Sequence, residues 1–383
     1  MYKLPEKLKS KLEERKNQNT LRKLGVHNNI IDFASNDYLG FSKSKNIFTV
    51  AHRHLIDHNH IQNGSTGSRL LSGNHILYDE VEDLICKIHD CETTLIFNSG
   101  YDANLGFFSC VPQRGDFIFY DELIHASIRD GIRMGNAKAY KFKHNDLEDL
   151  KKRCRIEKGR NPLNSEFYIV TESVFSMDGD SPDLKALASF CKEANCHLIV
   201  DEAHAVGVFG VKGVGIIQQL ELQHEVFARL VTFGKALGCH GAAILGSAEL
   251  KKYLVNFSRP LIYTTALPPH SLATIQSSYA ELNKTPSIEL LHQNILTFKA
   301  ESIRHRLQGH FIESDSSIQC CIISGNEKVK SISKQLQNKG FDVKPILSPT
   351  IPQGKERLRF SLHAYNSRNE ISEVLSLLST FVT

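Results

Sequence analysis

HLIVDEAH (197–204) is a short apolar run that ends in an aspartate and is followed, three residues later, by a histidine. Comparable apolar runs lie on either side of it, and stretches with helical periodicity separate several of them. The runs cover residues 93–97, 116–120, 168–173, 197–202, 229–234 and 241–246. Near-continuous runs of Ile, Val and Leu that alternate with helices are typical of a mainly parallel sheet with helices on both faces. We therefore expect an α/β fold.

The segment before the first run has the pattern of an amphipathic helix. Asn74 can cap this helix, and the apolar residues that follow recur with a period of 3.6. These residues are Leu77, Val81, Leu84, Ile85 and Ile88. A tight turn at 98–100 then joins the run 93–97 to a further predicted helix.

The pattern changes after about residue 283. A long helical segment is followed by three further apolar runs, at 317–324, 342–347 and 357–363. A predicted helix follows the first of these runs, and another follows the last. This indicates a smaller C-terminal α/β domain. We expect an N-terminal helical segment and arm at 1–45, a large domain at 46–282 and the small domain at 283–383.

Composition excludes several classes of protein. The 383 residues carry 46 basic and 42 acidic side chains, and the resulting net charge of +4 is too small to indicate a nucleic-acid partner. No apolar run approaches the ~20 residues that a membrane-spanning helix needs, and no apolar stretch follows the basic N-terminus as it would in a secretory signal. Instead, Leu4, Leu8 and Leu12 share one stripe of a predicted exposed helix.

The cysteines indicate a reducing environment. Nine are present, without a CxxC motif or a spacing that suits zinc. We therefore expect no metal site, and we expect reduced thiols in a cytoplasmic protein.

The candidate functional residues follow the apolar runs, because ligands of a doubly wound sheet bind beyond the carboxyl ends of its strands. Asp201 closes the run 197–201 and His204 lies shortly after it. Lys235 follows the run 229–234, and the small glycines on either side of it, at 234 and 238, leave room for a bulky group beside its amine.

Three further candidates lie in corresponding places. His125 follows the run 116–120, and Ser176 follows the run 168–173. The tripeptide Ser99-Gly100-Tyr101 lies between a strand and a helix, where free backbone N–H groups and the helix dipole favour a phosphate.

Each of these residues, taken alone, has a plainer explanation. A lone aspartate at a strand end is commonly a helix cap, a lone histidine is commonly a structural residue, and Lys235 alone could be a surface lysine. Their coincidence at one edge of a sheet favours pyridoxal phosphate. This cofactor needs a lysine for its imine, a buried carboxylate that keeps the pyridine nitrogen protonated, donors for its phosphate and a flat partner for its ring.

Nearly the whole chain carries blocks of a known family. The blocks are SNDYLGF (35–41), GSTGSRLLSGN (64–74), FNSGYDAN (97–104), DELIHASIRDG (121–131), ESVFSMDGD (172–180), DEAHAVGVFG (201–210), TFGKALG (232–238), YTTALPP (263–269) and RLRFSLH (357–363). In these blocks the sequence resembles the α-oxoamine synthases, which join an amino acid to an acyl thioester with loss of carbon dioxide. The resemblance implies a fold-type I pyridoxal-phosphate transferase with a mainly parallel sheet of the seven-stranded type.

The resemblance also implies a role for each candidate residue. Lys235 forms the imine and later moves the α-proton of the substrate, and Asp201 pairs with the pyridinium nitrogen. His125 stacks on the ring, and His204 and Ser176 approach its phenolic oxygen. The residues implied around the phosphate are Ser99, Gly100, Tyr101 and Thr232, with Thr264 and Thr265 of a neighbouring subunit. The shared phosphate site implies a homodimer.

Substrate-binding residues are implied in the same way. Asn36 and Arg359 are similar to the pair that holds the substrate carboxylate, and Arg22 matches a residue near the acyl-chain site. Arg357 and Arg359 share one face of their predicted strand by alternation, and a structural ion pair is the alternative for Arg357.

The resemblance is nearest to the members that condense L-alanine with a pimeloyl thioester, carried by coenzyme A or a carrier protein, in biotin synthesis. The stretch SPTIPQGKERLRF (348–360) favours them. Two positions depart from the pattern, because Tyr101 stands where many relatives have phenylalanine and Val206 where threonine is frequent. Glycine C-acetyltransferase, 5-aminolevulinate synthase and serine palmitoyltransferase are therefore alternatives. From another class, a non-catalytic cofactor-binding sensor would predict an added DNA-binding segment or the loss of Lys235.

Overall fold

The computed structural model describes residues 3–22, 24, 30–160 and 165–382. The chain forms two compact units. The large unit comprises Asn36–His292 and His363–Tyr365, and the small unit comprises Met1–Ser35, Gln293–Leu362 and Asn366–Thr383. The division that we expect from the sequence, at residues 45 and 283, stays a prediction.

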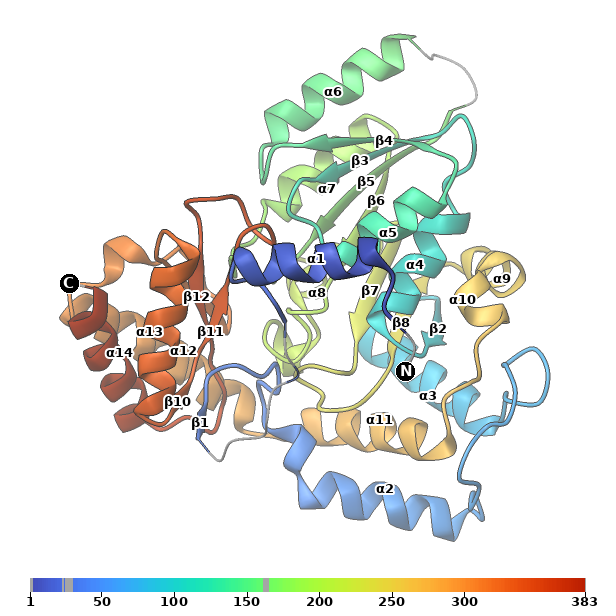
Figure 1. The fold of residues 1–383 in the computed structure, drawn as a ribbon. Coiled ribbons are helices and arrows are strands. Elements are labelled where there is room, and N and C mark those ends of the chain that lie inside the picture. Colours follow the sequence, from blue (N-terminus) through green and yellow to red (C-terminus); the bar gives the residue numbers. More distant parts are fainter. Residues whose placement is uncertain (1–2, 23, 25–29, 161–164, 383) are drawn as a thin grey trace. The chain divides into compact units, whose positions relative to one another are not determined.

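The large unit is built on a seven-stranded sheet (Figure 1). Its strands are β2 (Thr93–Phe97), β3 (Phe117–Asp121), β4 (Lys138–Phe142), β5 (Phe167–Glu172), β6 (His197–Asp201), β7 (Ala228–Thr232) and β8 (Ala242–Gly246). They lie in the order β2-β8-β7-β6-β5-β3-β4. Strand β8 is antiparallel to both of its neighbours, and the other paired strands are parallel. The predicted, mainly parallel sheet is therefore confirmed.

Helices separate most of these strands along the chain. They are α2 (Lys45–Asp57), α3 (Ile76–His89), α4 (Gly100–Cys110), α5 (Ala126–Met134), α6 (Leu147–Arg160), α7 (Leu184–Glu193), α8 (Ile216–Gln219), α9 (Ala248–Phe257), α10 (Arg259–Ile262) and α11 (Pro269–Leu282). Two short 3₁₀ segments, η1 (Phe41–Lys43) and η2 (Val211–Gly213), lie between them, and α12 (Ser287–Arg304) follows.

Both faces of the sheet are buried under helices. Ile118 and Val170 belong to a core with side chains of α4, α5 and α9. Their neighbours Phe119 and Ile169 belong to a second core with side chains of α6 and α7. Successive side chains of a strand point to opposite faces, so every position of these strands has to be apolar. This is why the runs show no polar alternation.

Strand β4 is absent from our sequence prediction. It is the last strand of the sheet, and Lys138 and Lys141 are exposed within it. An edge strand with lysines lacks the continuous apolar run by which the inner strands are recognised.

The start of α3 also differs from the prediction. The helix is capped by His75 rather than by Asn74, whose Oδ1 instead accepts a hydrogen bond from Nε of Arg69 at 2.9 Å. The predicted period is confirmed, because Leu77 and Val81 are fully buried.

The small unit contains a three-stranded antiparallel sheet and a two-stranded parallel one. Its strands are β1 (Ile31–Asp32), β9 (Ile318–Ile322), β10 (Phe341–Asp342), β11 (Lys344–Ile346) and β12 (Arg357–Ser361). Its helical segments are α1 (Glu6–Asn17), η3 (Gln308–His310), α13 (Asn326–Asn338) and α14 (Arg368–Val382). The predicted α/β character of the C-terminal part is thus confirmed.

The predicted N-terminal helix corresponds to α1. Its Leu8 and Leu12 are 47% and 50% exposed, and Leu4, just before it, is 44% exposed. Across the described ranges of the chain, no helix combines the length and the apolarity that crossing a membrane requires.

Candidate active site

The carboxyl ends of the parallel strands carry polar residues at one edge of the sheet. Strands β3, β5, β6 and β7 end at Asp121, Glu172, Asp201 and Thr232. Glu172 and Asp201 lie directly opposite each other in the register of β5 and β6. The turns that follow these strands hold most of the residues predicted from the sequence.

Lys235 lies in the turn after β7 and contacts a buried histidine. Its Nζ is 2.6 Å from Nε2 of His204, and Nδ1 of His204 is 2.7 Å from the hydroxyl of Tyr38. His204 is 4% exposed and Tyr38 is fully buried. An imidazole held between an amine and a phenol has both nitrogens engaged, which fixes the orientation of the ring. The contact between Lys235 and His204 was expected only through a common ligand, and Tyr38 was not predicted.

Glycine permits this contact by allowing two turns to approach closely. Gly207 has φ +80°, and a Cβ built on it would lie 2.3 Å from Cβ of Ala236. The turn that carries His204 can therefore pack directly against the turn that carries Lys235.

The two glycines beside Lys235 differ in their surroundings. A Cβ on Gly234 would make only ordinary van der Waals contacts, the nearest with the carbonyl oxygen of Cys239 at 3.7 Å, and the prediction that this glycine leaves room beside the amine stays a prediction. A Cβ on Gly238 would lie 2.2 Å from the backbone nitrogen of Ser42. Gly238 therefore serves close backbone packing, and the prediction that it leaves room for a bulky group is wrong.

Asp201 is a buried carboxylate whose two oxygens are both engaged. It is 6% exposed; Oδ1 accepts the backbone N–H of Ala203 and Oδ2 accepts Nδ2 of Asn104, both at 2.9 Å. Asn104 lies on α4 and also donates to Oγ of Ser127 at 3.1 Å. Asn104 closes the block FNSGYDAN (97–104), but its contact with Asp201 is not among our predictions, because a polar residue inside a helix gives no sign of its partner.

The same network continues to His125. Oγ of Ser127 is 2.7 Å from Nδ1 of His125, and the backbone N–H of His125 donates to Oε1 of Glu172 at 2.6 Å. Burial lowers the pKa of His125, and the charge of Asp201 opposes this change. Asp201 and His125, which lie far apart in the sequence, are therefore joined through Asn104 and Ser127.

The start of α4 provides a site with free backbone donors. Ser99 is the N-cap residue, and its Oγ accepts the backbone N–H of Asp102 at 3.0 Å. The first N–H groups of a helix have no partner within the helix. A Cβ on Gly100 would be in van der Waals contact with Oγ1 of Thr232 at 3.7 Å, so the side chain of Thr232 lies beside this helix end. The adjoining Tyr101 donates its hydroxyl to Asp130 at 2.7 Å.

Thr264 and Thr265 lie next to this helix end within the same chain. Nδ2 of Asn98 donates to Oγ1 of Thr264 at 3.4 Å and to the carbonyl of Thr265 at 2.6 Å. Thr265 is exposed. Their predicted contact with the phosphate of a neighbouring subunit stays a prediction.

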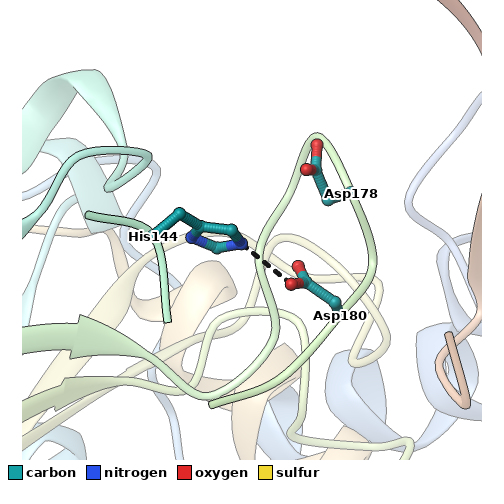
Figure 2. A group of neighbouring side chains, drawn as sticks. All are labelled: His144, Asp178 and Asp180. Carbon is teal, nitrogen blue, oxygen red and sulfur yellow. Dashed lines mark hydrogen bonds and ion pairs between the residues drawn. The ribbon is translucent and has the colours of Figure 1, made fainter. Parts of the chain in front are cut away.

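Ser176 lies in the loop after β5. This loop is anchored by His144, which pairs with Asp180 of the same loop (Figure 2). Nε2 of His144 is 2.8 Å from Oδ2 of Asp180, and Nδ1 is 2.9 Å from Oδ1 of Asp121. The ring of His144 also meets the ring of Phe175 edge-on, with 4.5 Å between centroids. The residue before Ser176 is thereby held against the end of β3.

His144 holds this loop as a charged group. Burial lowers its pKa, but the hydrogen bonds and charges of Asp121 and Asp180 outweigh burial and raise the pKa to about 10. The sequence prediction missed His144 because it missed β4, after which His144 lies.

The same region could be considered as a metal site. His144, Asp178 and Asp180 bring potential ligand atoms to within 4.8 Å of one another. However, both ring nitrogens of His144 already pair with carboxylates, one of them that of Asp180 itself. The arrangement is that of an ion-pair cluster.

The remaining predicted residues are divided between the units. Asn36 belongs to the large unit, where its Oδ1 accepts the hydroxyl of Tyr38 at 3.2 Å. Arg22 and Arg359 belong to the small unit; Arg22 is exposed, and Nη1 of Arg359 donates to Ser361 at 3.2 Å. Arg357 is 4% exposed. The predicted grip of Asn36 and Arg359 on a substrate carboxylate stays a prediction.

The residues of the large unit fit pyridoxal phosphate. Lys235 supplies a primary amine, and Asp201 supplies a buried carboxylate. The start of α4 supplies backbone N–H donors. The hydroxyl of Thr232 lies beside these donors, because a Cβ on Gly100 would be 3.7 Å from its Oγ1.

Comparisons with known proteins identify the family. The family model for aminotransferase class I and II matches residues 28–378. An 8-amino-7-oxononanoate synthase of Emericella nidulans is 37% identical, over 99% of this chain and 96% of that protein.

Solved structures share the whole fold. A structure of serine palmitoyltransferase with a pyridoxal-phosphate internal aldimine has a TM-score of 0.88 at 25% identity, covering 98% of this chain and 96% of the other. An 8-amino-7-oxononanoate synthase of Francisella tularensis has a TM-score of 0.77 at 29% identity, covering 92% and 97%. The predicted fold type and cofactor are thereby confirmed. The chain belongs to the aminotransferase class I and II family, and within it to the α-oxoamine synthases, which are pyridoxal-phosphate-dependent acyltransferases.

Proposed function

We propose that the protein condenses L-alanine with a pimeloyl thioester, carried by coenzyme A or a carrier protein. The products are 8-amino-7-oxononanoate, carbon dioxide and the free thiol, and the reaction belongs to biotin synthesis. The name of the Emericella nidulans relative supports this substrate pair, because the identity of 37% extends over 99% of the chain. The structural observation that carries the proposal is the 2.6 Å contact between Nζ of Lys235 and Nε2 of His204, beside the buried carboxylate of Asp201.

Lys235 acts in two ways in this proposal. Its amine holds the cofactor, and after L-alanine has taken its place the free amine removes the proton from Cα of alanine. Pyridoxal phosphate, when bound, supplies an aldehyde that takes up amines and a ring that draws electrons from Cα. His204 receives a proton from Lys235 or returns it, because its Nε2 is in hydrogen-bond contact with Nζ.

Asp201 keeps the ring nitrogen of the cofactor protonated. A buried carboxylate next to the ring nitrogen stabilises the protonated pyridinium and so raises the pKa of that nitrogen. Asn104 and the N–H of Ala203 orient the carboxylate. By the family resemblance, His125 would lie against the face of the ring, and His204 and Ser176 would lie near its phenolic oxygen.

Substrate recognition in this proposal depends on the residues that the family resemblance implies. Arg359 and Asn36 hold the carboxylate of alanine until it leaves as carbon dioxide, and an arginine suits this task because it can bind a carboxylate through two parallel hydrogen bonds. Arg22 lies near the acyl chain.

The active site is completed in a homodimer. Thr264 and Thr265 of one subunit approach the phosphate bound at Ser99, Gly100, Tyr101 and Thr232 of the other. The exposure of Thr265 supports this role, and its position beside Asn98 places it next to the start of α4 in the same chain.

A substrate panel tests the reaction. The cofactor-loaded protein is supplied with L-alanine and pimeloyl-coenzyme A, or with pimeloyl carrier protein, and thiol release and product mass are measured. Glycine with acetyl-coenzyme A, glycine with succinyl-coenzyme A and L-serine with palmitoyl-coenzyme A form the comparison set. The proposal fails if one of these three pairs reacts faster than alanine with either pimeloyl donor.

A second experiment tests the amine. Reduction of the loaded protein with borohydride, followed by peptide mapping, should place the cofactor on Lys235. Lys235→Ala should lose the tag and its visible absorption, whereas Lys252→Ala, at an exposed position of α9, should keep both. A tag on another lysine would exclude the assignment.

Serine palmitoyltransferase is the second candidate. The structure of that enzyme superposes better, with a TM-score of 0.88 against 0.77 for the 8-amino-7-oxononanoate synthase. The sequence favours the first candidate, because identity is 37% to the Emericella nidulans protein and 25% to the palmitoyltransferase. The substrate panel separates the two.

A further inference from the structure

Cys154 and Cys196 form a thiol pair in the large unit. Cys154 lies on α6, and Cys196 lies in the turn before β6, at the opposite end of that strand from Asp201. Their sulfur atoms are 3.8 Å apart. A disulfide needs the sulfurs about 2.05 Å apart, a change within reach of side-chain rotation in an exposed turn. The pair is far apart in sequence and close in space.

The two thiols differ in their access to solvent. Cys154 is 1% exposed, whereas Cys196 is half-buried. An oxidant from solution would therefore reach Cys196, and Cys154 would be left as the inner partner. This is the arrangement of a reactive cysteine with a resolving cysteine beside it.

Lys158 gives the turn a positive charge next to Cys196. Its Nζ donates to the carbonyls of Ala194 and Asn195, the two residues before Cys196. The hydrogen bond from Cys154 lowers the pKa of Cys196, burial opposes this, and the charge of Lys158 lowers the pKa further. A thiolate is the form that reacts with peroxides, so Lys158 favours reaction at Cys196.

Cys110 shows how burial changes the pKa of a thiol that has no neighbouring lysine or cysteine of this kind among the described residues. It is also half-buried, but burial raises its pKa to about 12. The difference between Cys110 and Cys196 therefore lies in their partners rather than in their exposure class.

We propose that Cys196 is a site of reversible oxidation by hydroperoxides, and that Cys154 converts the product into a disulfide. In the first step the Cys196 thiolate takes an oxygen from hydrogen peroxide, which gives a sulfenic acid and, with one proton, water. In the second step the Cys154 thiol attacks the sulfenic sulfur, the S–S bond forms and a second water leaves. Two thiols and one peroxide thus give one disulfide and two waters, and an added dithiol reverses the change.

A second pair of thiols provides a comparison. Cys86 and Cys91 both lie near Oγ1 of Thr94, at 3.1 and 3.6 Å. The hydrogen bond from Cys91 lowers the pKa of Cys86 to about 7, although burial opposes it. This pair lies on the C-terminal end of α3 and the turn after it, so peptide mapping distinguishes its products from those at Cys196.

The test uses the full chain, reduced, freed of reductant and exposed to hydrogen peroxide. Non-reducing peptide mapping should find the peptide of Cys154 joined to that of Cys196, and dithiothreitol should release it. Cys154→Ser should leave a sulfenic acid at Cys196 that dimedone traps, and Cys196→Ser should leave Cys154 reduced. Cys191→Ser is the matched control, because Cys191 is 2% exposed on the neighbouring α7, and this variant should still form the cross-link.

Lys158→Met tests the role of the positive charge. Alkylation of Cys196 by iodoacetamide at neutral pH should be several-fold slower in this variant, while alkylation of Cys110 stays unchanged. The proposal is overturned if peroxide leaves Cys196 reduced in the wild-type chain, if Cys196 pairs with another cysteine, or if Cys196 reacts no faster than Cys110. These measurements follow thiols rather than turnover, so they are independent of the proposed reaction.

Discussion

Glu172 and Asp201 face each other at the ends of adjacent parallel strands, with their backbones in register. They are 3% and 6% exposed. Burial, and then the charge of Asp201, raise the pKa of Glu172 to about 8. Glu172 is therefore largely uncharged at neutral pH.

Glu172→Gln should flatten the pH dependence of stability. The neutral form of Glu172 contributes stability that is complete below its ordinary pKa of 4.5 and is lost as the pH rises through about 8. The free energy of unfolding of the variant should fall less between pH 5.5 and 8.5, by on the order of 2 kcal/mol. Urea denaturation of the cofactor-free protein measures this. Glu13→Gln, at an exposed position of α1, should follow the wild type. Equal slopes in all three proteins would contradict the shift.

Asn104→Ala should impair the proposed proton removal. The variant loses the 2.9 Å hydrogen bond that orients Asp201 and the link to Ser127. Exchange of the α-proton of L-alanine in deuterated water should slow about tenfold, which corresponds to ~1.4 kcal/mol. Asn256→Ala, on the exposed side of α9, serves as the control. An unchanged exchange rate with normal cofactor loading would show that Asp201 needs no support from Asn104.

His144→Gln should remove a stabilising charge from the loop of Ser176. The pKa of His144 is raised from 6.5 to about 10, so its contribution is complete below pH 6.5 and is lost as the pH rises towards 10. The wild type should lose free energy of unfolding between pH 7 and 10, and the variant should start lower by about 2 kcal/mol and change less. Hydrogen exchange should also be faster in residues 173–180. His52→Gln, at an exposed position of α2, should behave like the wild type.

Gly207→Ala should separate the turns that carry His204 and Lys235. The new methyl group would lie 2.3 Å from Cβ of Ala236, at a residue with φ +80°. We expect a loss of about 2–3 kcal/mol in the free energy of unfolding, together with weaker cofactor binding. Gly64→Ala is the control, since a Cβ there meets nothing within 4 Å. A stable variant with full cofactor affinity would show that the two turns can move apart without cost.

The sequence was a good guide wherever the signal is local. Inner strands of a two-sided sheet are apolar at most positions, so their ends, and with them Asp201, His204 and Lys235, could be placed from the chain alone. The strand β4 could not, because an edge strand needs polar side chains on its exposed positions. Because β4 was not predicted, His144, which lies after it, was not predicted as a functional residue either.

Other residues depend on contacts that no local pattern reveals. Asn104 is a polar residue inside a helix, and only the packing of α4 on the sheet brings it to Asp201. Tyr38 lies 166 residues before its partner His204. Such partners could have been sought by asking which groups satisfy a buried carboxylate and a buried imidazole.

The edge strand β4 of the large sheet affects how copies of the chain can associate. Strand β4 presents Lys138 and Lys141 to solvent along a border where another β-segment could add by backbone pairing. If two copies met edge to edge, Lys138 and Lys141 of one copy would be repelled by the same lysines of the other. This repulsion disfavours the addition of one sheet to another through the β4 edge. The exposed lysines of β4 therefore protect the fold against fibre-like association through this unpaired edge of the sheet.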